Sequence, residues 1–303
     1  MSTLEDVRQR VRQQMLGYTR DQQQISLLNS SINASDSALV LDSSTATAIS
    51  RGLVEIDDEL ILIKSVDQST GTAAVMGGVL GRGREGSAPA AHSAGALVTM
   101  SPVMPRISIT NAINDTVRAM YPTLPITQAV EIIKLAPVFE YAMPAEAVEI
   151  HYVTNQTTGP SKVWYPGPRF RWNSNADPTS FPSGKSIQLL DDVIPGRAMR
   201  VVYMVQPNVM SAPGDDFSAV TGYPDSAQDV VAWGACARLV PSYETARLQG
   251  QSVEGTERAN LVPPKAALQA ADYYRSLYEA ALERERNRFW DSAPMFSFYQ
   301  GGG

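Results

Sequence analysis

The feature that most constrains the fold is one amphipathic helix that lies between two blocks of short apolar runs. Its apolar side chains recur at the spacing of a helix with one buried face: Ile109, Ala112, Ile113, Thr116, Val117 and Met120. Pro122 ends the pattern, because the residue before a proline disfavours the helical conformation. We therefore expect a mixed α+β chain in which this helix links two β modules.

Both blocks have the pattern of antiparallel sheets. In the first block, the apolar runs 54–66 and 72–76 are joined by the turn-rich residues 67–71, which predicts a hairpin. The second block extends from about Val130 to Gln206, and its short strands are separated by proline, glycine and asparagine turns. Regular short strands of this kind predict a small sandwich or barrel.

Helices are predicted at both ends of the chain. Thr3 and Asp6 have the spacing of a capping box at a helix start. Ile25, Leu28 and Ile32 suggest a second short helix. The chain turns helical again after about residue 213, and three helices are expected there: Asp229–Val240, Ser242–Gly250 and Lys265–Phe289.

These patterns divide the chain into a helical part and two small antiparallel β modules. The fold class is α+β, with helices at the N-terminus, in the centre and in the C-terminal third. The expected parts are an N-terminal helical segment (1–37), a small β module (38–104), a linking amphipathic helix (105–125), a β-sandwich-like module (126–212), a C-terminal helical module (213–292) and an extended C-terminal arm (293–303).

Composition and charge exclude several classes of protein. The formal charge of −6 argues against a nonspecific nucleic-acid binder, which would need a basic surface. With Cys236 as the one cysteine and two histidines, neither an internal disulfide nor a zinc site is expected. No run approaches the ~18 apolar residues of a membrane span, and the N-terminal residues lack the apolar segment of a secretory signal. We expect synthesis in the cytoplasm and no membrane partner.

The segment Gly81-Arg-Gly-Arg-Glu-Gly86 matches the glycine pattern of a dinucleotide-binding turn. That pattern needs a βαβ unit, but a hairpin precedes it here, and no carboxylate stands about 20 residues further on. The glycines are better explained as a sharp path with positive φ at the edge of a small β module.

Other motifs that could support chemistry also lack their partners. Gly184-Lys185-Ser186 ends a phosphate-loop pattern, but Thr179 stands where its first glycine is required. His92 lies in a small-residue run suited to close packing, and His151 alternates on a strand as a half-exposed sheet residue. Arg169-Phe-Arg-Trp172 places its arginines on one strand face and its aromatics on the other. The paired acids are expected on a strand that faces water or in turns: Asp57-Asp58-Glu59, Asp191-Asp192 and Asp215-Asp216. We expect no catalytic residue, no cofactor and no metal ion, and an enzymatic role would depend on these motifs alone.

Taken in order, several segments resemble head-to-tail connector proteins, the adaptors of the neck of long-tailed bacteriophages. In the first β module these are residues 51–64, 81–86 and 91–98, although Ser87 stands where many relatives have threonine. The resemblance continues through the central helix and the C-terminal helices: Pro105-Arg106, Ala112-Ile-Asn114, Met120-Tyr-Pro122, residues 233–239, residues 243–247 and residues 274–288.

The resemblance implies a structural virion protein at the head–tail interface. Such a protein forms a ring beneath the portal, extends the DNA channel and presents a surface to the next neck or tail protein. It further implies a ring of twelve subunits, to match the portal, through which genomic DNA passes without sequence-specific binding. A tail-terminator, another tail component or a baseplate component is the alternative, and the helical C-terminal third favours the adaptor.

The expected contact with the portal or a neighbouring subunit lies at the C-terminal end. Pro294 discourages further helix, so Pro294 to Tyr299 is expected to be an extended docking segment. In adaptors of this kind a C-terminal arm commonly contacts the portal. The alternative is that these aromatics fold back onto the helical module as core. The residues expected at the interface are Arg284, Arg286, Arg288, Trp290, Phe296, Phe298 and Tyr299.

Overall fold

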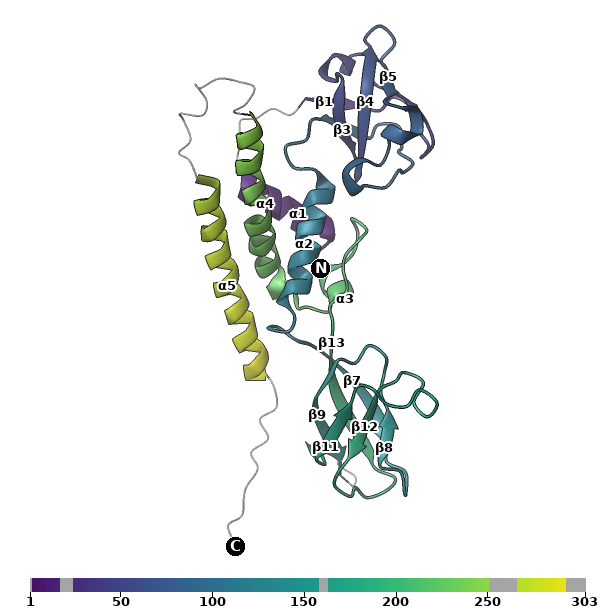
Figure 1. Cartoon of the computed structure of the whole chain (residues 1–303), viewed down its shortest axis with the longest axis vertical. Coiled ribbons are helices and arrows are strands. Elements are labelled where there is room, and N and C mark those ends of the chain that lie inside the picture. Colours follow the sequence, from purple (N-terminus) through teal and green to yellow (C-terminus); the bar gives the residue numbers. More distant parts are fainter. Residues whose placement is uncertain (1, 17–23, 158–162, 251–265, 293–303) are drawn as a thin grey trace.

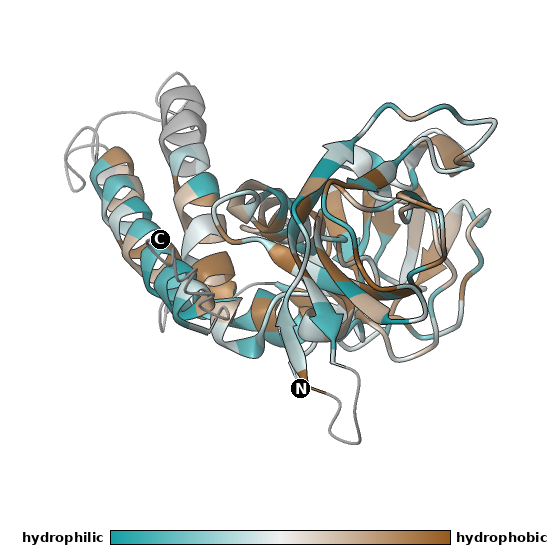
Figure 2. Ribbon diagram, turned by 90° about the horizontal axis from the view of Figure 1, so that it is seen from below, coloured by the Kyte–Doolittle hydropathy of each residue, from teal (hydrophilic) through white to brown (hydrophobic). Residues whose placement is uncertain are grey.

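The computed structural model describes residues 2–16, 24–157, 163–250 and 266–292. The molecule is elongated, with a half-barrel of strands at one end, a helical body in the middle and a second β module at the other end (Figure 1). Seen along the long axis, the two long helices of the C-terminal third lie to one side of the two β modules (Figure 2). The described residues contain five α-helices and three antiparallel sheets, so the predicted α+β class is confirmed.

The first sheet is a half-barrel with the strand order β1-β6-β3-β4-β5-β2. Its two edge strands meet at one end, where the Asn29 amide donates to the Val40 carbonyl at 2.7 Å and the Asp42 amide donates to the Leu27 carbonyl at 2.8 Å. Its core is separate from that of the rest of the chain. The strands are β1 (Ile25–Leu27), β2 (Ala38–Val40), β3 (Gly52–Ile56), β4 (Glu59–Asp67), β5 (Thr72–Val75) and β6 (Leu97–Met100).

The short helix predicted from Ile25, Leu28 and Ile32 is wrong, because this segment forms β1 and the loop after it. Leu28 and Ile32 are buried as the pattern required, but Ile25 is 48% exposed. The segment is extended because it pairs with β6, with Ile25 opposite Thr99 and Leu27 opposite Leu97. Tertiary strand pairing therefore overrides a helical spacing that rested on three residues.

The helical body consists of α1 (Leu4–Leu16), α2 (Arg106–Met120), the short α3 (Phe217–Thr221), α4 (Gln228–Gly250) and α5 (Ala266–Ser292). The predicted capping box is confirmed, since Asp6 Oδ2 accepts the Thr3 amide at 2.8 Å and Thr3 Oγ1 accepts the Asp6 amide at 3.3 Å. The predicted apolar face of α2 is buried. None of the helices in the described ranges is long and apolar enough to cross a membrane.

The two helices predicted on either side of Pro241 form the single helix α4. This helix packs closely because it carries Gly234 at its crossing with α2 and α5. A Cβ atom at this position would lie 2.3 Å from Thr116 Cγ2 and 2.9 Å from Tyr278 Cδ2. Only a glycine allows both neighbours to approach this far.

The second β module has two sheets whose inner faces pack on each other and share one hydrophobic core with the helical body. Their orders are β10-β9-β13-β7 and β11-β12-β8. The β character predicted from about Val130 to Gln206 is confirmed, although β7 begins earlier and β8 was not among the expected strands. The strands are β7 (Ile126–Ile133), β8 (Glu140–Ala142), β9 (Glu149–Gln156), β10 (Trp164–Pro166), β11 (Phe170–Asn173), β12 (Ser186–Leu189) and β13 (Ala198–Val205).

Candidate functional site

The glycine-rich motif surrounds a buried ionic cluster in the half-barrel. The Arg82 guanidinium forms two bonds with Glu59, from Nε to Oε1 at 2.7 Å and from Nη2 to Oε2 at 2.8 Å. Its remaining donors bind the backbone carbonyls of Asn33, Asp36 and Ala90. Both charged side chains are fully buried. The arginine therefore ties β4 to two loops and has no donor left for a phosphate.

His92 belongs to the same cluster, which corrects the prediction that it serves close packing. Its Nε2 lies 2.9 Å from Glu59 Oε2 and its Nδ1 lies 2.7 Å from Asp57 Oδ2. The acids also differ from prediction, because Asp57 and Asp58 form the turn between β3 and β4 while Glu59 is buried. The turn forms here because Asp57 adopts a left-handed conformation, with φ of 52°.

The contacts within the cluster favour the charged forms of Glu59 and His92. Burial alone would raise the pKa of Glu59, but donors from Arg82, His92, Ala90 and Gly83 outweigh burial and lower the pKa to about 2. Burial lowers the pKa of His92, but the bonds to Glu59 and Asp57 more than offset it, so this pKa is raised. Because both oxygens of Glu59 are occupied, the carboxylate is a structural group and not an acid or base for catalysis.

The glycines of the motif allow a sharp backbone path that a residue with a side chain could not follow, as predicted. Gly83 has a φ of 59°, and a Cβ atom there would lie 2.5 Å from Pro89 Cδ. A Cβ atom at Gly81 would lie 2.4 Å from the Met76 carbonyl oxygen. The motif thus lets the chain pass close to β5 while Arg82 enters the core of the half-barrel.

A second polar cluster joins the half-barrel to the helical body. Glu55 of β3 is 5% exposed and accepts the amide of Arg106, the first residue of α2, at 2.5 Å. Pro105 has no side chain that could cap this helix, so the half-barrel supplies the cap. Arg8 of α1 contacts Asp58 at 2.8 Å. A pocket of about 410 Å³ lies at this junction.

The other predicted motifs have structural partners. Lys185 Nζ donates to the carbonyls of Ala145 and Ala147. On β11, Phe170 and Trp172 pack against the core while Arg171 is exposed, as predicted. Asp216 caps α3, and no group of three potential metal ligands occurs in the part of the chain that the structure describes.

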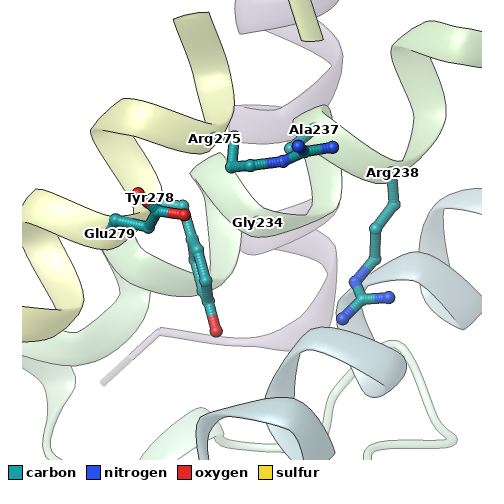
Figure 3. A pocket seen from close by; sticks show the side chains of 6 residues that line it. All are labelled: Gly234, Ala237, Arg238, Arg275, Tyr278 and Glu279. Carbon is teal, nitrogen blue, oxygen red and sulfur yellow. The ribbon is translucent and has the colours of Figure 1, made fainter. Parts of the chain in front are cut away.

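A pocket of about 270 Å³ lies between α4 and α5 (Figure 3). Arg238 extends from α4, and its Nε donates to Thr116 Oγ1 of α2 at 3.2 Å. Arg275 extends from α5 and lies 3.7 Å from Asp272. Glu279 of α5 also lines this pocket and adds a carboxylate to it. The mixed charge of this pocket does not select an anionic ligand.

The C-terminal end of α5 contains four of the predicted interface residues. The Trp290 ring lies 5.5 Å from the His151 ring of β9 and is 47% exposed. Arg284 and Arg286 are exposed, and Arg288 binds Glu285 at 3.0 Å. A pocket of about 360 Å³ separates this end of α5 from the start of β7. Residues Phe296, Phe298 and Tyr299 lie outside the described residues.

Residues 92–295 match the family model described as SU10 adaptor protein. This match covers more than half of the chain. The chain belongs to the SU10 adaptor protein family. The predicted resemblance to head-to-tail connectors is confirmed, and membership identifies a structural protein of the phage virion. That the phage has a long tail remains a prediction. No curated protein matches the chain.

The adaptor also has an exposed apolar surface that the sequence analysis missed. It lies at the end of the second β module, around the loops that follow β7 and β12, and we call it the apolar end patch. Backbone bonds from Lys134 to Arg197 and from Leu189 to Phe139 bring these loops together. Contiguous exposed apolar residues mark interaction surfaces. The members are between 37% and 58% exposed: Ile133, Leu135, Val138, Phe139, Leu190 and Ile194.

Proposed function

We propose that this adaptor forms a ring that docks under the portal, extends the DNA channel and offers the attachment surface for the next neck or tail protein. The observation that carries the proposal is the family match over the second β module and the helical body except α1. The elongated shape supports it, because separate modules at the two ends can meet different partners (Figure 1).

The contact with the portal or a neighbouring subunit is proposed at the C-terminal end of α5 and the residues after it. Trp290 is half-exposed although it is aromatic, and Arg284 and Arg286 have exposed guanidinium groups. Aromatic and arginine side chains are the types most enriched in binding hot spots. The apolar end patch is proposed as a second contact, directed at another protein of the virion.

The ring is proposed to contain twelve subunits, to match a twelvefold portal. With a charge of −6 each, twelve subunits would carry 12 × (−6) = −72. A mainly negative lumen lets DNA pass without adhesion, because affinity for DNA comes from groups that neutralise phosphates. No sequence-specific contact with DNA is proposed.

The test is direct imaging of mixtures of the purified adaptor with isolated portal rings. The expected result is an added ring with twelvefold symmetry on one end of the portal. A Trp290→Ala, Arg284→Ala double variant should bind more weakly, whereas the exposed Arg171→Ala of β11 serves as the matched control. Binding to tail tubes or baseplates in place of portals would support the alternative tail role and refute the proposal.

A further inference from the structure

Strand β7 is an unprotected sheet edge. It pairs with β13 over eight consecutive residue pairs, from Ile126 opposite Val205 to Ile133 opposite Ala198. No strand covers its other side in the part of the chain that the structure describes. It contains no proline and one charged residue, Glu131, and most of its residues are exposed. A long and nearly uncharged edge is a template for pairing with another strand.

The other edges of this module are protected in the usual ways. Strand β10 has three residues and ends in Pro166, and β8 also has only three residues. Strand β11 has four residues and includes the charged Arg171. Short length, proline and charge are the common devices that prevent edge-to-edge association. Strand β7 has eight residues and no proline, so Glu131 is its single device of this kind, which indicates that another segment covers this edge.

The chain itself supplies a segment of suitable chemistry next to this edge. Helix α5 ends at Ser292, which lines the same pocket as Thr127 near the start of β7. The residues that follow, Ala293-Pro-Met-Phe-Ser-Phe-Tyr-Gln300, have no charged side chain and are rich in aromatics, which favour strands. We propose that residues 295–300 add to β7 of the same chain as a parallel strand.

The dimensions of the two segments agree. From Thr127 to Ile133 the strand spans roughly 20 Å, at about 3.4 Å per residue. An extended chain from Ser292 to Tyr299 reaches roughly 23 Å. Phe298 and Tyr299 would therefore arrive beside Ile133, at the border of the apolar end patch. The short tether raises the effective concentration of the segment at this edge to about the millimolar range.

This pairing gives the unassembled adaptor a means to avoid premature association. While residues 295–300 cover β7, the edge cannot pair with β7 of a second copy. Engagement of the C-terminal residues by a virion partner requires that the segment leave β7. The edge pairing itself does not depend on the proposed ring, because it concerns the free chain alone.

Disulfide trapping in the free chain tests this proposal. The variant Glu131→Cys, Ser297→Cys places one thiol on an exposed residue of β7 and one opposite it in the segment. The control Gln188→Cys, Ser297→Cys uses an exposed strand residue of the opposite sheet. The native Cys236 can remain, since it is buried and burial raises its thiol pKa to about 12. At micromolar protein, the Glu131→Cys variant should form an intrachain disulfide about ten times faster than the control.

Hydrogen exchange supplies a reading that needs no cysteine variant. Amides on the outer edge of β7 should exchange slowly in the full chain and rapidly after truncation behind Ser292, while amides of β9 stay unchanged. Equal trapping rates, disulfides only between chains, or unprotected β7 amides would each overturn the proposal. Neither measurement involves portal rings, so failure here leaves the adaptor function untouched.

Discussion

Replacement of Arg82 by alanine is expected to destabilise the half-barrel severely. The side chain is fully buried and makes five hydrogen bonds, two of them to the equally buried Glu59. Removing one partner of a buried ion pair leaves an uncompensated charge, which typically costs about 3–5 kcal/mol. Three backbone carbonyls lose their donor as well. We therefore expect a loss at the upper end of that range.

The matched control lies two residues away in the same motif. Arg84 is exposed, so Arg84→Ala should change the free energy of unfolding by no more than about 0.5 kcal/mol. Arg82→Lys keeps the positive charge but loses the planar guanidinium group with its paired donors. Its loss of unfolding free energy should therefore be intermediate. The expected order of stability is wild type, Arg84→Ala, Arg82→Lys and then Arg82→Ala.

The assay is urea unfolding combined with hydrogen exchange of strands β3 and β4, which reports on the half-barrel separately from the helical body. Lower protection of these strands is expected in both Arg82 variants. If Arg82→Ala unfolds on purification, Arg82→Lys still gives the ranking. Equal stability of the Arg82→Ala and Arg84→Ala variants would refute the structural role of the cluster.

Three further predictions concern pH, the histidines and the C-terminus. The pKa of Glu59 is lowered from 4.5 to about 2 in the folded chain. Above pH 4.5 this carboxylate should therefore contribute roughly 3 kcal/mol to the free energy of unfolding, and this contribution is lost as the pH falls toward 2. The midpoint of urea unfolding should fall over the same pH range, and a midpoint that does not change with pH would contradict the prediction. Replacement of His92 and His151 together by asparagine should leave virion assembly intact although the half-barrel loses stability, and a loss of infectivity without a loss of stability would restore a catalytic hypothesis. Truncation after Ser292 should change the melting temperature little but prevent the adaptor from joining DNA-filled heads in a sedimentation assay; a sharp fall in melting temperature would mean that the aromatic residues belong to the core.

The sequence predicts the parts of the fold whose signals are local. Helix α2 was predictable because six buried positions repeat at helical spacing, and α1 because its capping box lies within four residues. Strand β1 was missed because three residues carry little periodicity and its extended form depends on β6, about 70 residues away.

The candidate sites show the same limit. Glu59, Arg82 and His92 each stood out in the sequence, but as separate motifs. They form one cluster only because the β3–β4 turn, the glycine loop and the segment before β6 converge. The apolar end patch was equally invisible, since its members belong to loops that backbone bonds join across the second β module. Local patterns identify such residues but not their partners.

The distribution of apolar contacts explains why the two β modules should behave differently in an assembled neck. The second β module shares one continuous hydrophobic core with the helical body, so we expect these two parts to move as one unit. The half-barrel has its own core and is fastened to the body by the Glu55 cap on α2 and the ion pair from Arg8 to Asp58. Breaking such polar contacts costs less free energy than breaking an apolar core, because water can replace the lost hydrogen bonds. The family match also begins at residue 92, so most of the half-barrel precedes it. Reorientation of the half-barrel relative to the helical body is therefore expected at the junction between the half-barrel and α2.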